Sequence, residues 1–160
     1  MRVAPADHRD ARVGALIERH LDLMRSITPP ENVFAQDALG LIRDGARLFT
    51  VSDASQAILG IGAYKIIEPA HAELKSMHVV AEARGRGAGG ALLEQILEAA
   101  RGEGAMRASL ETGRAAAFTP ALELYRRAGF TPCGPFGGYV DNPFSVFLSR
   151  ALSGERPRRS

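Results

Sequence analysis

The chain has 160 residues, of which 46% are hydrophobic and 24% charged, a balance that predicts one globular domain over residues 1–153 with an apolar core. The net charge is +2, and residues 154–160 hold three arginines and one glutamate, so this basic tail accounts for all of it. A neutral body argues against a nucleic-acid-binding surface.

What the chain lacks excludes further classes of protein. No apolar run approaches the length of a membrane span, and the first residues are polar where a signal peptide needs an apolar stretch. We therefore expect a cytoplasmic protein with no membrane partner. A single cysteine, Cys133, cannot form an intrachain disulfide, and four scattered histidines lack the spacing of metal ligands, so no metal site is expected.

Two helices and two strands are predicted in the first part of the chain. Apolar residues recur at helical spacing over residues 9–24, and a shorter helix is predicted over residues 33–42, after the break at Pro29-Pro30. Residues 47–51 and 57–67 have the composition of strands. A short polar turn separates them, which predicts an antiparallel pair.

A β-α-β unit is predicted next. Its first strand spans residues 73–80, its helix runs from about residue 87 to 101, and its second strand covers residues 106–111. Because such a crossover joins parallel strands, the unit adds a parallel pair to the sheet. The remaining predicted elements are a helix over residues 118–128 and a strand over residues 144–148.

The most informative stretch is a glycine-rich loop between the first strand and the helix of this unit. It reads Arg84-Gly85-Arg86-Gly87-Ala88-Gly89-Gly90. Glycines let the backbone approach a ligand, and the free N–H groups of a first helical turn favour an anion. Arg84 and Arg86 add guanidinium groups suited to a diphosphate. The loop predicts a phosphate cradle, with a plain glycine-rich turn as the alternative.

Two nucleotide-binding schemes compete for this loop. Gly85, Gly87 and Gly90 match G-x-G-x-x-G, and Glu111 lies about 20 residues further on, where a dinucleotide enzyme has a ribose-binding acid. The context argues against this scheme, because residues 81–84 separate the strand from the first glycine and too little chain remains for a doubly wound sheet. A nucleoside-triphosphate loop is excluded, because no Lys-Ser or Lys-Thr follows the glycines.

The pattern Arg84-x-x-Gly87-x-Gly89 at a strand-to-helix junction resembles the pyrophosphate motif of the GNAT superfamily of acetyl-CoA-dependent acyltransferases. Residues 73–79, Glu-Leu-Lys-Ser-Met-His-Val, are similar to the family's central strand, and residues 124–130, Leu-Tyr-Arg-Arg-Ala-Gly-Phe, to its tyrosine-bearing helix. The resemblance implies an α/β fold with a mixed, mostly antiparallel sheet, one parallel β-α-β unit and helices on both faces. It also implies acetyl-CoA as cosubstrate and an amine of a small molecule as acceptor.

A narrower resemblance, to bacterial indoleacetate acetyltransferase-like members, rests on four segments. They are residues 26–31, 73–77, 110–113 and 133–147. Gly138 and Phe144 depart from those members, in a segment expected to border the acceptor. The identity of the acceptor is therefore not transferred with the name.

The resemblance assigns catalytic roles to Tyr125 and Glu73. Acyl transfer needs a neutral amine, a polarised thioester carbonyl and a proton for the departing thiolate. A phenol with a pKa of about 10 can protonate a thiolate whose acid has a pKa of about 8.5. Glu73 would take the amine proton through water, although a carboxyl with a pKa of about 4.3 is a weak base unless burial raises it. The structural alternatives are a packed core tyrosine and a solvated or salt-bridged glutamate.

The resemblance also implies binding roles on the same strand. In similar folds the backbone of Met77, His78 and Val79 pairs with the pantetheine arm and polarises the thioester carbonyl. Simple strand alternation predicts that Glu73 shares a face with Lys75, Met77 and Val79, and that His78 packs on the opposite face. Weaker candidates for acceptor binding are Glu31, Asn32, Glu111 and Tyr139.

Three other classes of function remain open at this point. A non-catalytic regulatory domain would bind acetyl-CoA without needing Tyr125, and an NAD(P)-binding enzyme would use the same glycines for a different nucleotide. A structural or partner-binding domain would bind neither ligand. The last strand and the aromatic residues between Phe136 and Phe147 are compatible with a homodimer, because sheet edges and aromatic patches are common interfaces.

Overall fold

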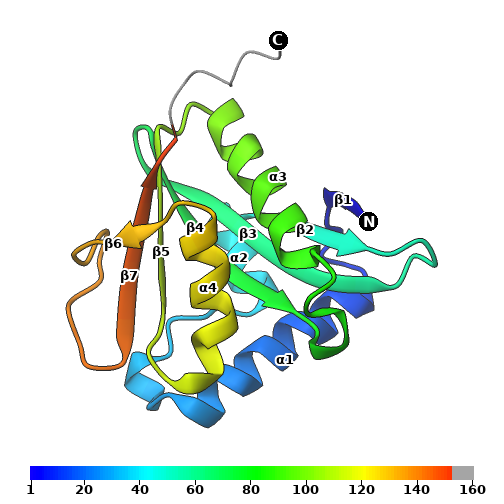
Figure 1. The fold of residues 1–160 in the computed structure, drawn as a ribbon, viewed down its shortest axis with the longest axis horizontal. Coiled ribbons are helices and arrows are strands. Elements are labelled where there is room, and N and C mark those ends of the chain that lie inside the picture. The colour runs from blue at the N-terminus through cyan, green and yellow to red at the C-terminus, as the bar shows by residue number, and fades with distance from the viewer. Residues whose placement is uncertain (153–160) are drawn as a thin grey trace.

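The computed structural model describes residues 1–152, and the predicted basic tail, residues 154–160, lies outside them. The core element is one seven-stranded sheet in the order β1-β2-β3-β4-β5-β7-β6 (Figure 1). Among the described residues only β4 and β5 pair in parallel, so the predicted mixed sheet with one parallel pair is confirmed. The strands are β1 (Arg2–Pro5), β2 (Arg47–Ser52), β3 (Ile58–Glu68), β4 (His71–Val79), β5 (Arg107–Gly113), β6 (Thr131–Pro132) and β7 (Ser145–Ala151).

Helices cover both faces of the sheet, as predicted (Figure 1). One face carries α1 and α2, and the other carries α3 and α4. The helices are α1 (Ala11–Ile27), α2 (Ala38–Arg43), α3 (Ala88–Gly102) and α4 (Thr119–Arg127), with single 3₁₀ turns at Pro30–Asn32, Ala81–Ala83 and Ala116–Phe118. The sequence interpretation missed β1 and β6, which have only four and two residues.

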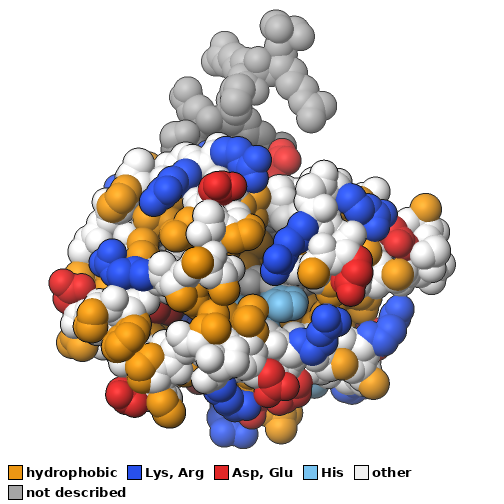
Figure 2. Space-filling model, turned by 60° about the horizontal axis from the view of Figure 1, so that its bottom comes forward, with side chains coloured by type: hydrophobic (Ala, Val, Ile, Leu, Met, Phe, Trp, Pro, Cys, Tyr) orange, Lys and Arg blue, Asp and Glu red, His pale blue; other side chains and the backbone are white. Residues whose placement is uncertain are grey.

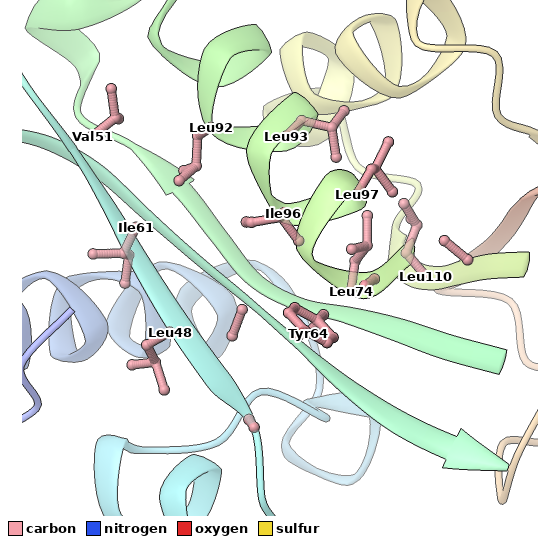
Figure 3. Close-up of a cluster of buried hydrophobic side chains, with 14 of the residues drawn as sticks. Leu48, Val51, Ile61, Tyr64, Leu74, Leu92, Leu93, Ile96, Leu97 and Leu110 are labelled. Carbon is pink, nitrogen blue, oxygen red and sulfur yellow. The ribbon is translucent and has the colours of Figure 1, made fainter. Parts of the chain in front are cut away.

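The main core lies between the sheet and α3. Figure 3 shows Leu92, Leu93, Ile96 and Leu97 of α3 pointing toward the strands, where Leu74 and Leu110 meet them from β4 and β5. These leucines and isoleucines recur at helical spacing, and that spacing gives α3 one continuous apolar side. On the opposite face α1 buries Val13, Leu16, Ile17, His20 and Leu21.

The second helix begins later than predicted. The sequence pattern indicated a helix over residues 33–42, whereas α2 spans only Ala38–Arg43. Asp37 explains the difference, because its carboxylate accepts a hydrogen bond from the backbone N–H of Gly40 at 2.7 Å and so caps the first turn. Residues 33–37 therefore form an irregular connection after the Pro30–Asn32 turn.

A β-bulge interrupts β4 at Ser76, which has a backbone φ of 58°. The bulge is visible in the register, because Ile61 pairs with His78 while Ala63 pairs with Lys75. Two residues of β4, Ser76 and Met77, therefore face one residue of β3. An extra residue of this kind reverses the alternation of side chains along the rest of the strand.

The predicted sharing of one face by Glu73, Lys75, Met77 and Val79 is wrong, because the prediction assumed an uninterrupted strand. A Cβ added at Gly62 would overlap the side chains of Met77 and Ile96, so Met77 lies on the α3 face. Val79 lies on that face too, since its side chain is close to Gly89 at the start of α3.

The parallel strands β4 and β5 separate before they end. Their pairing runs from His71 opposite Arg107 to Leu74 opposite Leu110, yet β4 continues to Val79 and β5 to Gly113 (Figure 1). Beyond Leu74 and Leu110 the two strands no longer pair with each other. Within residues 1–152 no other strand fills the gap between residues 75–79 of β4 and residues 111–113 of β5. This split is the feature that positions the site.

Candidate active site

A cleft of about 1570 Å³ runs through the split between β4 and β5. Its walls come from α1, Thr28 and residues 32–35, all of β4 from Glu73 onward, the glycine loop and α3, the end of β5, and α4. On the face drawn in Figure 2, hydrophobic side chains and several Lys or Arg side chains surround a histidine near the centre. Among the described residues, no group of three or more His, Cys, Asp or Glu side chains could hold a metal ion.

The glycine loop forms one wall of the cleft and leads into α3. Gly85 and Gly87 have φ angles of 78° and 83°, a conformation that favours glycine, and Gly87 is the N-cap of the helix. A Cβ placed on Gly85, Gly87 or Gly90 would meet no atom within 4 Å. Open space therefore lies over the loop, and the first N–H groups of α3 are free of intrahelical partners.

The two arginines of the loop differ in their surroundings. Arg84 lines the cleft and is close enough to His78 to lower its pKa. Arg86 is exposed, is not part of the cleft wall, and interacts electrostatically with Asp53 on the β2–β3 turn. Arg84 is therefore the loop arginine that faces a ligand in the cleft.

Glu73 and Tyr139 meet in the cleft although 66 positions separate them. The Tyr139 hydroxyl donates a hydrogen bond of 2.5 Å to Oε2 of Glu73, whose residue is only 4% exposed. Three rings pack edge-on or tilted against Tyr139 at centroid distances of 5.1, 5.2 and 5.7 Å, namely Phe34, Phe136 and Phe147. Burial, with the neighbouring Glu73 carboxylate, raises the pKa of Tyr139. The phenol therefore stays protonated and keeps donating to Glu73.

Lys75 lies next to Glu73 on the same side of β4. Its Nζ is 3.8 Å from Oε2 of Glu73, and its side chain is 9% exposed. Burial lowers the pKa of Lys75, and the Glu73 carboxylate opposes this effect.

Glu111 stands across the split, on β5. Lys75 and Glu111 are the first positions beyond the last paired residues, Leu74 and Leu110, and both alternate onto the face opposite α3. The Ser145 hydroxyl donates a hydrogen bond of 2.6 Å to Oε2 of Glu111. Burial raises the pKa of Glu111 to about 7, and the Ser145 hydrogen bond opposes that rise.

Tyr125 comes into the cleft from α4 and is 5% exposed. Its ring packs against Phe130 at 5.9 Å, and the backbone N–H of Phe130 donates to the Tyr125 carbonyl at 3.0 Å. Burial raises the pKa of Tyr125, and the Glu111 carboxylate raises it further, so these two side chains are electrostatic neighbours. A protonated phenol and an acid of near-neutral pKa thus line the same cleft.

A pair of histidines lines the opposite wall. His78 of β4 and His20 of α1 contact each other edge-on, with ring centroids 5.5 Å apart. Burial lowers the pKa of His20 to about 4, and burial also lowers the pKa of His78. The contact with α1 puts His78 on the face opposite Met77, which confirms that part of the sequence prediction.

The two weak candidates on the α1–α2 connection differ. Asn32 lines the cleft, whereas Glu31 is exposed and is not part of the described cleft wall.

Comparison with known proteins identifies the family of the chain. The model of the Acetyltransferase (GNAT) family matches residues 15–130. The chain belongs to the GNAT acetyltransferase family.

Relatives of this GNAT chain agree with the assignment. It is 36% identical over 154 residues to an uncharacterized N-acetyltransferase, YsnE, of Bacillus subtilis, covering 95% of this chain and 100% of that protein. It is also 36% identical to an IAA acetyltransferase of Azospirillum brasilense, covering 86% of this chain and 88% of that protein. Among solved structures, a putative acyl-CoA N-acyltransferase from Klebsiella pneumoniae has the same fold, with a TM-score of 0.78, 24% identity and coverage of 95% and 97%.

Family membership confirms the resemblance inferred from the sequence, including its indoleacetate acetyltransferase-like relatives. This GNAT protein is an acetyl-CoA-dependent N-acetyltransferase, and the NAD(P) and non-catalytic alternatives lose their support. No helix among residues 1–152 is long and apolar enough to cross a membrane.

The sequence interpretation of this GNAT site missed three participants. Lys75 was expected on the strand but had no assigned role, although its position two residues after Glu73 was a usable signal. His20 was interpreted as part of an apolar helix face, and nothing in the local sequence linked it to His78. Ser145 gave no signal, because its bond to Glu111 joins residues 34 positions apart.

Proposed function

We propose that this enzyme acetylates the amine of a small molecule bound in the cleft, with Tyr125 as the proton donor and the Glu73–Glu111 pair serving amine deprotonation. The observation that carries the proposal is the meeting of these groups at the split between β4 and β5. A buried phenol, the buried Glu73 carboxyl and the half-buried Glu111 carboxyl line one cleft there, next to a glycine loop with open space above it.

The acetyl-CoA diphosphate would bind on residues 84–90, and the pantetheine arm along Met77, His78 and Val79. Three observations support this fit. The loop glycines leave room for a ligand, Arg84 faces the cleft, and beyond Leu74 the β5-facing edge of β4 has no strand partner. In addition, the hydroxyl of Ser76 is buried and has no hydrogen-bond partner among the described residues. Acetyl-CoA supplies the acetyl thioester.

Two carboxyls are candidates for accepting the amine proton. The resemblance favours Glu73, acting through water. The geometry supports Glu111 as the direct acceptor, because Oε2 of Glu73 is already engaged by Tyr139, while Glu111 has a pKa of about 7, near the pH at which a base is most useful. Glu73 then acts through its charge, which raises the pKa of Glu111.

Tyr125 is suited to protonate the CoA thiolate as the thioester breaks. Its raised pKa keeps it protonated through the physiological range, and the proton donor and acceptor line the same cleft. A thiolate whose acid has a pKa of about 8.5 is a weaker base than the phenolate, so the transfer from Tyr125 relies on the thiolate forming next to it.

An amine fits the chemistry better than the carboxylate suggested by the name of the A. brasilense relative. Acetyl transfer to a carboxylate would give a mixed anhydride, which water hydrolyses readily. An amide product is stable, and the acid with a near-neutral pKa is suited to deprotonating an ammonium ion.

The first experiment titrates acetyl-CoA and NADH separately against the purified protein and follows the thermal midpoint, because a ligand that binds only the folded state raises it. We expect a rise with acetyl-CoA alone. Gly87→Glu should abolish that rise, whereas Gly87→Ala, which has the same backbone strain but little added bulk, should keep most of it.

The second experiment follows thiol release from acetyl-CoA with a panel of amines. Tyr125→Phe should lower kcat by about 10²-fold or more, the usual range for a lost general acid. Absence of a shift with acetyl-CoA, or unchanged turnover in Tyr125→Phe, would contradict the proposal.

A further inference from the structure

Lys75 has a largely buried side chain whose ammonium group makes no hydrogen bond among the described residues. Its side chain is 9% exposed and lines the cleft, and its nearest carboxylate oxygen, Oε2 of Glu73, lies 3.8 Å from Nζ. That separation exceeds the range of about 2.7 to 3.2 Å for an N–H···O hydrogen bond. Within residues 1–152 no other acceptor bonds to Nζ.

Oε2 of Glu73 accepts a hydrogen bond from another residue and does not need one from Lys75. The shorter contact to that oxygen is the 2.5 Å hydrogen bond from Tyr139. A simple buried ion pair would bring Nζ within hydrogen-bond distance, because only good geometry offsets the cost of removing both charges from water. The donors of Lys75 are therefore available to a ligand in the cleft, and the natural partner of a desolvated ammonium is an anion.

The position of Lys75 relative to Glu111 indicates which kind of anion would bind to Lys75. Both residues stand at the first position beyond the last pair of the β4–β5 ladder, one on each side of the split. Each influences the pKa of the other, so they are electrostatic neighbours. A ligand at the split thus meets a cation on one strand and a proton acceptor on the other.

An α-amino acid carries the two complementary groups on a single carbon. On the acceptor side the cleft wall includes apolar side chains beside the polar His20, Thr28 and Asn32. The apolar ones are Leu23 and Met24 of α1, Val33 and Phe34 of the connection, and Phe144 before β7. We propose that the acceptor is a free α-amino acid with an apolar side chain, held by its carboxylate on Lys75 with its amine beside Glu111. The inference rests on the acetyl transfer proposed above.

The reaction is balanced with these groups. Glu111 takes one proton from the ammonium form of the amino acid and later releases it to solvent. The neutral nitrogen forms a bond to the acetyl carbon and loses a second proton, which restores the Tyr125 phenol. The C–S bond of the thioester breaks, and the sulfur receives a proton from Tyr125. The products are an N-acetylamino acid, which keeps its carboxylate on Lys75, and CoA.

The test compares L-leucine with L-leucinamide and 3-methylbutylamine, which retain the apolar side chain but lack the carboxylate. L-methionine and L-phenylalanine are run with their amides in parallel. An α-amine beside an uncharged carbonyl has a pKa of about 8, lower than in the free acid, so chemistry alone would favour the amide. We expect the free acid to have the higher kcat/KM by about 10²-fold, measured as thiol release and checked by mass spectrometry of the product.

Variants at Lys75 assign the preference to this residue. Lys75→Met should lower the ratio of kcat/KM for acid to that for amide by about 10²-fold, because it leaves the carboxylate without a partner. Lys75→Arg retains the charge and should restore most of the ratio. Should Lys75→Met fail to fold, the comparison of acid and amide on the wild-type protein still decides the proposal.

The outcomes separate this inference from the proposed function. If amides or simple amines are acetylated as well as the acids, or if Lys75→Met leaves the ratio unchanged, the inference is wrong while acetyl transfer stands. If no tested amino acid is acetylated or raises the thermal midpoint of the CoA-loaded protein, the inference is also wrong. Loss of the acetyl-CoA response itself in the wild-type protein would instead overturn the proposed function.

Discussion

Replacing Glu111 by Gln tests the strongest electrostatic feature of the site. Burial raises the pKa of Glu111 from its ordinary 4.5 to about 7. At about 1.4 kcal/mol per pKa unit, ionising this carboxyl in the folded protein costs about 3 kcal/mol of stability. Gln is nearly isosteric, its side-chain oxygen still accepts from Ser145, and it carries no charge to desolvate.

The sign of the effect follows from proton binding in the two states. The unfolded chain releases the Glu111 proton near pH 4.5, whereas the folded protein holds it until about pH 7. Between these values the folded state binds more protons, so its stability falls as the pH rises and the full cost is present above pH 7. Glu111→Gln removes this loss of stability with rising pH. About 2.5 kcal/mol of the loss occurs between pH 5 and pH 9.

The assay is urea unfolding at pH 5 and pH 9 for wild type, Glu111→Gln and a control, Glu123→Gln, on the exposed side of α4. The loss of stability between the two pH values should be about 2.5 kcal/mol smaller in Glu111→Gln than in the other two proteins. Parallel pH dependence in all three proteins would refute the raised pKa. The same variant should lose about 10²-fold or more in kcat/KM and lose the inflection near pH 7, if Glu111 is the base.

Two further substitutions test how the site is supported. Tyr139→Phe removes the hydrogen bond to Glu73, and because hydrogen bonds to charged groups contribute about 1.5 to 3 kcal/mol, we expect a lower urea midpoint. The variant should also show an altered pH–rate profile; a profile identical to wild type would separate Tyr139 from the chemistry. Gly113→Ala would overlap the ring of Phe118 and should cost about 1 to 3 kcal/mol in unfolding free energy. Gly102→Ala, where a Cβ meets open space, is its control and should not destabilise the protein.

The elements that the sequence predicted well are those with strong local signals. The strand, glycine loop and helix that run from β4 into α3 were predicted because apolar periodicity and glycine spacing are local properties. The short strands β1 and β6 carry no such signal, since their four and two residues become strands only by pairing with β2 and β7.

The geometry of the site was less predictable for a related reason. Glu73 and Tyr125 were proposed from a resemblance, and the cleft contains both. The partners that tune the site come from distant positions, as with Tyr139 on Glu73 and Ser145 on Glu111. No periodicity reports a contact between residues that far apart, so neither bond could be inferred before the fold was known.

Under the proposed function, the bulge at Ser76 would let one strand serve two ligands. Before it, Glu73 and Lys75 face the acceptor side; after it, Met77 and Val79 turn toward α3. In an uninterrupted strand, Met77 and Val79 would share the face of Glu73 and Lys75, and apolar side chains would occupy the space beside the charged ones. With the bulge, the acceptor side keeps its acid and its ammonium, while the backbone beyond Lys75 keeps a β5-facing edge without a strand partner for an extended ligand. A single inserted residue therefore separates the polar wall proposed to bind the acceptor from the edge proposed to bind acetyl-CoA.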